Sequence, residues 1–271
     1  GDMETFHSEN YDLIHPQLDA LEAELGMLKD EYEFCCCHAI DGEDIVETGI
    51  DTFVIDGQIP DKIMMGIEVK DLGYFGSVKR MDMIPKHIAK TIEAFEDTFK
   101  DYEYRNFYSN ELRIGKDKKP YVTDHTCRLG SPPSELFFEM IENIGDIIDQ
   151  GSQGILVEPK YKAKYGLQAI ITSSWAEEHW QPIQIDPEVA EFVKIKNMTV
   201  IDDMTYYIPI NDIEMEQIGS IVAYGNTPQE AHKKLVKYAD GVKGYGIKIN
   251  VGSIDKAMEE VNKAKKIGIY F

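Results

Sequence analysis

Residues 109–135 hold two strand-like runs separated by a turn, and this pattern constrains the fold more than any other feature of the chain. The first run contains Glu111, and a turn rich in lysine, aspartate and glycine follows it. In the second run, Asp124, Thr126 and Arg128 are spaced two residues apart. Because successive side chains of a strand point to opposite faces, these three share one face, and a hairpin brings Glu111 beside them.

Two carboxylates, a hydroxyl and an arginine on one sheet face suit a magnesium ion and a polyphosphate. Mg²⁺ prefers a few hard oxygen ligands together with phosphate oxygens, and arginine stabilises phosphoryl charge. The alternative is an ordinary hairpin with a solvated polar face, since any half-exposed strand shows this alternation. The spacing alone leaves both interpretations open.

The hairpin resembles a segment of the ATP-grasp ligases, which carry a glutamate on one strand and the pattern E-x-N-x-R on the next. The run DHTCRLGSPPSE (124–135) is most similar to phosphoribosylamine–glycine ligases, whose strand ends like EFNCRFGDPE. Two further segments resemble that family in the same order. They are GYFGSVKRMDMIPKHI (73–88), similar to a Gly-rich segment before a helix, and IGSIVAYGNTPQEAHKKL (218–235), similar to a C-terminal segment.

The resemblance implies roles for the hairpin residues. Glu111, Asp124 and Thr126 would be the metal ligands, and Arg128 the catalytic residue that steadies a transferred phosphoryl group or an acyl phosphate. Asp124 replaces the family's glutamate and Thr126 its asparagine, and both are shorter, although a hydroxyl still offers an oxygen ligand. The family's GDPE is GSPPSE here, which argues against the same substrates. The alternatives are solvated strand carboxylates and an arginine in a surface ion pair.

A second group of residues is similar to the family's nucleotide-binding segment between two lobes. The run Glu33-Phe34-Cys35-Cys36 resembles E-x-F/Y-L, whose backbone groups bond the adenine edge in the family. Nearby glutamates bond the ribose there, and Glu43 and Glu47 are the candidates in this chain. The cofactors that the resemblance implies are therefore ATP and Mg²⁺, or Mn²⁺ in its place. The alternative for residues 32–40 is a plain core strand.

A glycine-containing loop is expected at residues 73–79, with Gly73, Gly76, Ser77 and Lys79. Such loops bring backbone N–H groups close to anions, but the family's loop is much richer in glycine. His125 lies between two proposed ligands in sequence, and the strand alternation places it on the opposite face. It is expected to be a core or surface residue.

Other conspicuous residues are expected to pack rather than to bind. Trp175, His179 and Trp180 in SSWAEEHW (173–180) are typical of the packed face of a helix or turn. The cysteines, three consecutive at 35–37 and Cys127 alone, have no zinc or disulfide spacing. They are interpreted as small apolar fillers in a reducing cytoplasm.

The composition narrows the classes of partner. The 271 residues suffice for a real core, and 28 basic against 49 acidic residues give a formal charge of −21. This balance argues against nucleic acid as a partner, because phosphate backbones are bound through lysine and arginine. No apolar run is long enough to span a membrane and no signal peptide is recognised, so a cytoplasmic protein is expected.

The order of the expected elements indicates an α+β fold with an antiparallel sheet. Residues 1–160 are expected to form the second lobe of an ATP-grasp domain, and residues 161–271 a smaller C-terminal α+β domain like that of the phosphoribosylamine–glycine ligases. Helices are expected up to Gly26, at 85–100, at 131–151, after a capping box of Thr227 and Glu230, and after a capping Ser253. In the helix at 131–151, the residues expected to face inward are Leu136, Met140, Ile144 and Ile148.

The sequence therefore predicts the C-terminal part of an ATP-dependent carboxylate–amine ligase that acts through an acyl phosphate. Its substrates would be a small-molecule carboxylate and an amine. The lysines and Gly-rich loop of the first lobe are expected from an earlier segment or a separate chain, so this chain alone is expected to be inactive. The alternatives are a non-catalytic nucleotide-binding or interaction module and a purely structural partner protein. A homodimer is a further expectation.

Overall fold

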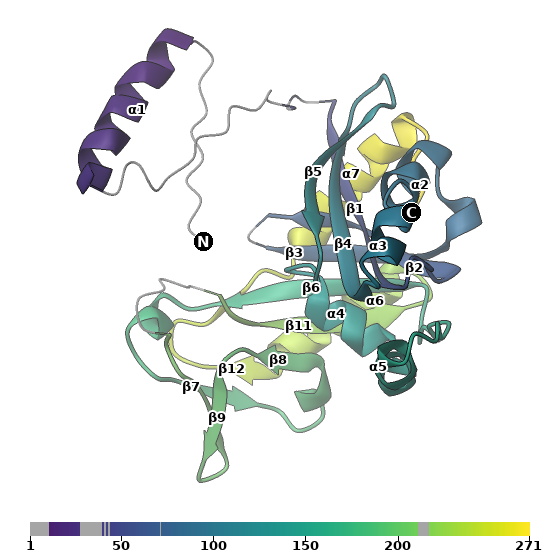
Figure 1. The fold of residues 1–271 in the computed structure, drawn as a ribbon. Coiled ribbons are helices and arrows are strands. Elements are labelled where there is room, and N and C mark those ends of the chain that lie inside the picture. The colour runs from purple at the N-terminus through teal and green to yellow at the C-terminus, as the bar shows by residue number, and fades with distance from the viewer. Residues whose placement is uncertain (1–10, 28–39, 41, 43, 71, 211–216) are drawn as a thin grey trace. The chain divides into compact units, whose positions relative to one another are not determined.

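The computed structural model describes residues 11–27, 40, 42, 44–70, 72–210 and 217–271 (Figure 1). The chain divides into two compact units, Gly1–Ala39 and Ile40–Phe271. In the first unit, helix α1 (Tyr11–Leu25) ends before Gly26, whose φ of +55° glycine adopts at little cost. The helix predicted to end at Gly26 is confirmed.

A nine-stranded sheet forms the centre of the second unit, with all its pairings antiparallel. Its strands are β1 (Val46–Ile55), β2 (Lys62–Val69), β3 (Gly73–Arg80), β4 (Arg105–Ile114), β5 (Pro120–Thr126), β6 (Tyr165–Thr172), β8 (Val193–Ile195), β11 (Gln217–Gly225) and β13 (Lys248–Ile249). The order is β5-β4-β1-β2-β3-β6-β11-β8, with β13 also on β6. The predicted α+β class with an antiparallel sheet is confirmed.

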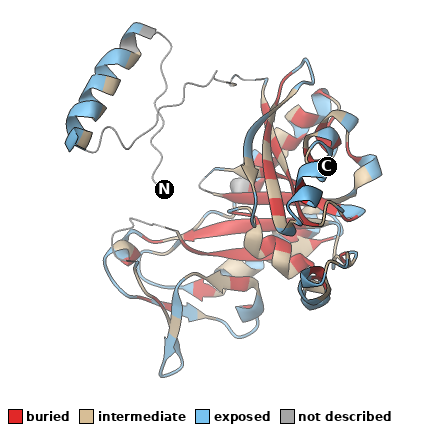
Figure 2. Ribbon diagram, in the orientation of Figure 1, coloured by how far each residue is buried: buried red, intermediate tan, exposed pale blue. Residues whose placement is uncertain are grey.

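Helices cover both faces of this sheet. On one face, Val46, Ile50 and Val54 of β1 pack against α2 (Lys86–Glu93) and α7 (Ser253–Lys266). On the other, Phe53 and Ile55 pack against α4 (Ser134–Met140) and α5 (Ile144–Ser152). Figure 2 shows the buried residues concentrated along these central strands. The second face turns polar towards the start of β1, beyond the apolar contact with α4 and α5.

Two helices expected to be continuous are interrupted. The amphipathic helix predicted at 85–100 is α2 followed by α3 (Glu96–Asp101), with the break at Ala94 and Phe95. The helix predicted at 131–151 is α4 followed by α5. In α5 it is Ile147 that is buried, whereas Ile148, expected to face inward, is 51% exposed. The break between α4 and α5 changes which residues face inward, so helical spacing counted across it predicts the wrong buried residue.

Residues 73–79, expected as a loop, belong to strand β3. Gly73 and Gly76 serve close packing within the sheet instead of anion binding. A Cβ added at Gly73 would lie 2.0 Å from the backbone oxygen of Gln168, and one at Gly76 would lie 2.6 Å from the Met64 sulfur. Glycine inside a strand is typical of such close approach.

A four-stranded sheet lies beyond the main one, in the order β12 (Val242–Lys243), β7 (Gln181–Ile185), β10 (Met204–Tyr207), β9 (Met198–Ile201). The Trp175 and His179 rings stack with centroids 4.0 Å apart, and Trp180 meets Tyr206 edge-on. Trp175 is 41% exposed and Trp180 is 51% exposed, so this predicted packing takes place at the surface.

The C-terminal helices follow the sequence signals in one case. Helix α6 (Pro228–Asp240) begins with the predicted capping box, in which the Thr227 hydroxyl accepts a hydrogen bond from the Glu230 N–H. In α7, however, Ser253 is the first helical residue and Gly252 occupies the cap position. The predicted cap at Ser253 is wrong by one residue.

Strands from both sides of residue 160 pair in the main sheet, since β3 pairs with β6. If the predicted division into 1–160 and 161–271 holds, the two parts share one continuous sheet. None of the helices in the described part of the chain has the length and apolar character that crossing a membrane requires.

Candidate functional site

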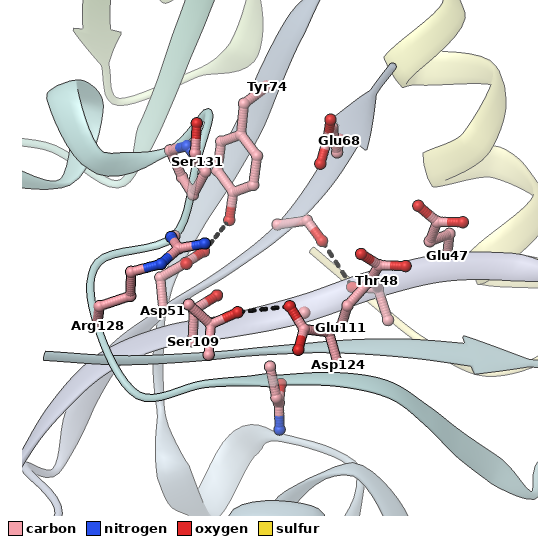
Figure 3. A pocket seen from close by; sticks show the side chains of 16 residues that line it. Glu47, Thr48, Asp51, Glu68, Tyr74, Ser109, Glu111, Asp124, Arg128 and Ser131 are labelled. Atoms are coloured by element: carbon pink, nitrogen blue, oxygen red, sulfur yellow. Dashed lines mark hydrogen bonds between the residues drawn. The ribbon is translucent and has the colours of Figure 1, made fainter. Parts of the chain in front are cut away.

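A pocket lies on the polar part of the main sheet's second face, where the side chains of β1 to β5 that Figure 3 labels converge. Its floor comes from β1 to β5, and the loop after β5, residues 128–133, forms one wall. It encloses about 90 Å³. That suits a metal ion with part of a phosphate, because pockets for whole ligands measure roughly 300–1,000 Å³.

The hairpin residues meet in this pocket. Glu111 on β4 and Asp124 on β5 are direct cross-strand neighbours, and Thr126 lies opposite Ser109 two pairs further along. Together with Arg128, all four predicted residues line the pocket. The sequence alternation thus placed them on one face of the sheet, as the strand geometry requires.

Hydroxyl groups hold both carboxylates. The Thr126 hydroxyl donates to Asp124 Oδ2 over 2.7 Å, and the Thr123 hydroxyl donates to Glu111 Oε1 over 2.9 Å. Thr123 reaches Glu111 because the β4–β5 register shifts between Glu111 and Leu112. Each carboxylate therefore keeps a second oxygen for another ligand.

Arg128 is the only basic side chain among the described residues that line the pocket. One of its guanidinium nitrogens, Nη1, donates to the backbone oxygen of Leu129 over 2.7 Å. This bond orients the group and leaves its other donors for an anion. The remaining charged lining residues are acidic: Glu47, Asp51, Glu68, Glu111 and Asp124.

The predicted nucleotide residues are only partly described. Glu47 lines the pocket on β1 and forms an ion pair with Arg113, with Nη2 and Oε2 2.9 Å apart. Glu33, Phe34, Cys36 and Glu43 lie outside the described residues.

His125 and Cys127 lie next to the site residues in sequence, and the structure agrees with the prediction for His125 but not with that for Cys127. His125 points away from the pocket, hydrogen-bonds the Tyr108 hydroxyl and lies against the Phe95 ring, as expected for the opposite strand face. Cys127, interpreted as an apolar filler, is exposed, because it follows the end of the edge strand β5. The other three cysteines, at 35–37, lie outside the described residues.

The pocket also contains a buried acid that the sequence reading missed. Asp51 on β1 is 5% exposed, and its Oδ2 accepts a hydrogen bond of 2.5 Å from the Tyr74 hydroxyl. Burial raises the pKa of Asp51 to about 6, although the hydroxyl groups of Tyr74 and Ser109 oppose that shift. The signal was present in the sequence: an aspartate in the apolar run IDTFVI, where unpaired acids are rare.

Two glycines make this arrangement sterically feasible. The Tyr74 ring crosses β2 over Gly66, where an added Cβ would lie 1.9 Å from the tyrosine oxygen. The loop passes over Asp51 at Gly130, where an added Cβ would lie 2.9 Å from Asp51 Oδ1. Burial also raises the pKa of Tyr74 well above its usual value, with the Asp51 carboxyl adding to the effect. Tyr74 therefore stays protonated and donates.

We expect Gly66→Ala to lower the free energy of unfolding by about 1–2 kcal/mol, because the new methyl displaces the Tyr74 ring. Gly145→Ala in α5 is the matched control, since nothing lies within 4 Å of its added Cβ. It should be neutral or stabilising by up to about 1 kcal/mol. Urea unfolding of both variants measures the difference, and equal effects would contradict the tight crossing at Gly66.

The donor set fits a magnesium ion. Mg²⁺ is commonly held by one or two carboxylates, with water and substrate phosphates completing its shell. Glu111 and Asp124 supply two such carboxylates on facing positions. Among the described residues no three His, Cys, Asp or Glu side chains are grouped for a metal ion, and a site of this two-carboxylate kind does not need a third.

Comparisons with known proteins bear on the fold. No protein-family model matches the sequence, and no curated protein resembles it in sequence. Among solved structures, phosphoribosylamine–glycine ligase from Thermotoga maritima matches with a TM-score of 0.62 at 15% identity, over 78% of this chain and 56% of that one. Biotin carboxylase from Campylobacter jejuni, in a β-γ-ATP complex, matches with a TM-score of 0.55 at 13% identity, over 94% and 58%.

L-amino acid ligase from Bacillus licheniformis matches with a TM-score of 0.50 at 14% identity, over 88% of this chain and 61% of that one. The chain thus spans little more than half the length of these three proteins. At such identities the likeness concerns the fold. Over the residues that these matches cover, the chain has the fold of the ATP-grasp enzymes, as the resemblance of its motifs predicted.

Proposed function

We propose that this chain is part of an ATP-dependent carboxylate–amine ligase that acts through an acyl phosphate. The observation that carries the proposal is the meeting of Glu111, Asp124 and Arg128 in one pocket on an ATP-grasp-like sheet. Two carboxylates and one arginine are the groups that a metal-bound polyphosphate requires.

Each residue has a role in this proposal. Glu111 and Asp124 hold Mg²⁺ through their free carboxylate oxygens, and Thr126 orients Asp124 through its hydrogen bond. Arg128 binds the transferred phosphoryl group with the donors that Leu129 does not use. The metal, when bound, supplies charge neutralisation to the phosphates. The proposal assigns the ribose to Glu47, whose carboxylate pairs with Arg113.

The remaining parts of the reaction concern the two substrates and the rest of the nucleotide site. We propose a small carboxylate as the phosphoryl acceptor and an amine as the final nucleophile. An additional lobe, from the same or another chain, would close over the phosphates, in keeping with the partial coverage of the matched structures. We also propose that the chain forms a homodimer, which is one assembly that would bring two chains together.

Isothermal titration with Mg²⁺ and β,γ-imido-ATP tests the nucleotide site in the complete gene product. We expect Arg128→Ala to weaken binding about tenfold or more, the scale of a lost charge-assisted hydrogen bond. Arg80→Ala is the control, because Arg80 pairs with Asp82 at the surface and does not line the pocket. Equal affinities of the wild type and Arg128→Ala would contradict the phosphoryl role.

One observation favours a second candidate, a nucleotide-binding module without catalysis. Thr123 and Thr126 each occupy one oxygen of the proposed metal ligands. If those bonds persist when Mg·ATP is bound, the metal has fewer ligands from the protein. Single-turnover measurement with γ-labelled ATP separates the candidates, because the module binds nucleotide and releases no phosphate even when a panel of carboxylates is offered.

A further inference from the structure

The proposed function assigns no role to Asp51, although this acid on β1 lies in the floor of the same pocket. The two carboxylate oxygens of Asp51 have different surroundings. Oδ2 is held by the Tyr74 hydroxyl at 2.5 Å, whereas Oδ1 is buried near the Ser109 hydroxyl and makes no hydrogen bond of good geometry. A buried acceptor without a partner is costly, and natural structures rarely keep one without a reason.

Two glycines allow the packing that leaves Asp51 Oδ1 buried. Tyr74 reaches Asp51 only because residue 66 is glycine, and the loop covers Oδ1 only because residue 130 is glycine. Gly130 lies two residues after Arg128 in the loop that forms the pocket wall, so an amine can reach Oδ1 only if this loop moves aside.

We propose that Asp51 is the proton acceptor for the amine nucleophile, an inference that rests on the proposed ligase function. The amine nitrogen uses its lone pair to form the new C–N bond with the acyl carbon. The C–O bond to phosphate breaks, and phosphate leaves with that electron pair. The proton moves from nitrogen to Asp51 Oδ1, and the electron pair of the broken N–H bond stays on nitrogen.

Three of the four other acids that line the pocket already have a proposed role or an ion-pair partner. Glu111 and Asp124 belong to the proposed metal site, and Glu47 is in an ion pair with Arg113. Asp51 has no basic partner among the described residues, and its raised pKa, about 6, lets it accept and return a proton near neutral pH. Tyr74 orients it by donating to the other oxygen.

The groups that face Asp51 do not compete for the proton. From β3 comes Tyr74 and from the segment after α5 comes Tyr161, and burial raises the pKa of both phenols, so both stay neutral. The charged groups lining the same pocket are Glu47, Glu68, Glu111, Asp124 and Arg128.

Carbon NMR of protein labelled at the aspartate Cγ tests whether an amine reaches Asp51. The Asp51 signal is identified by its loss in Asp51→Asn. We expect methylamine to move this signal saturably in the complete gene product, and tetramethylammonium, a cation without an N–H donor, to leave it in place. No movement with methylamine, or equal movement with both, would overturn the proposal.

A kinetic measurement tests the transfer step itself. With a carboxylate that supports ADP formation, Asp51→Asn should form ADP within a few-fold of the wild-type rate and transfer the acyl group to methylamine at least about a hundredfold more slowly. Tyr74→Phe, which keeps the carboxyl group, should show a smaller loss of transfer. Equal loss of ADP formation and transfer in Asp51→Asn would indicate a structural role and overturn the proposal.

The two proposals fail in different ways. If no carboxylate in a broad panel supports ADP formation by the wild type, the ligase function fails, whatever Asp51 does. The NMR titration still decides in that case whether Asp51 receives an amine N–H.

Discussion

Glu111→Gln should lower the turnover of the complete gene product by at least about a hundredfold, the scale of losing one electrostatic stabiliser of the transition state. Glutamine keeps the size of the side chain and can still accept the Thr123 hydrogen bond, so the fold should survive. It removes one of the two carboxylate charges that face each other across β4 and β5. Steady-state ADP formation at saturating Mg²⁺ measures the loss.

Glu93→Gln is the matched control for this prediction, because Glu93 is an exposed glutamate at the end of α2, remote from the residues that line the pocket. Its turnover should equal that of the wild type. A second readout is the affinity for Mn²⁺, measured by electron paramagnetic resonance, which should fall in Glu111→Gln alone. Unchanged turnover and unchanged Mn²⁺ affinity in Glu111→Gln would refute the metal assignment.

The hairpin was predictable from the sequence because local geometry determines it. A strand has a side-chain period of two, so the spacing of Asp124, Thr126 and Arg128 already places them on one face. The turn between the strands then brings Glu111 to the same face. The start of helix α6 was predictable for the same reason, because the capping box of Thr227 and Glu230 is a local signal.

The rest of the pocket depends on which strands become neighbours, and local patterns do not state that. Asp51 and Tyr74 meet across β2 only because β1, β2 and β3 pair in sequence and Gly66 leaves room between them. The same limit explains the strand β3, where glycines that suggested a loop relieve contacts with Gln168 and Met64. Tertiary packing outweighed local propensity there.

Helix breaks escaped prediction for a related reason. The stripe through Ile144 and Ile148 assumed a continuous helix from the segment of Pro132 and Pro133 onward. The backbone instead turns between α4 and α5, and Ile147 becomes the buried residue. No proline or glycine marks the break at Ile141–Asn143, so the periodicity gave no sign of it.

Asp51→Asn should stabilise the protein above neutral pH, by up to about 3 kcal/mol at pH 8, the equivalent of about two pKa units. The pKa of Asp51 is about 6 in the folded protein, against 3.8 without burial. Between these values the folded state binds the extra proton, so stability falls as pH rises from about 4 to 6 and stays lower above. Asparagine carries no charge and avoids that loss.

Urea unfolding at several pH values measures this effect, with Asp149→Asn as the control on the exposed side of α5. The advantage of Asp51→Asn should be largest at pH 8 and disappear by about pH 4, whereas Asp149→Asn should show no such trend. If Asp51→Asn is less stable than the wild type at every pH, the carboxyl group is needed for local packing. A gain of stability together with a loss of acyl transfer would show that the buried acid is kept for function at the expense of stability, the trade-off expected of a catalytic group.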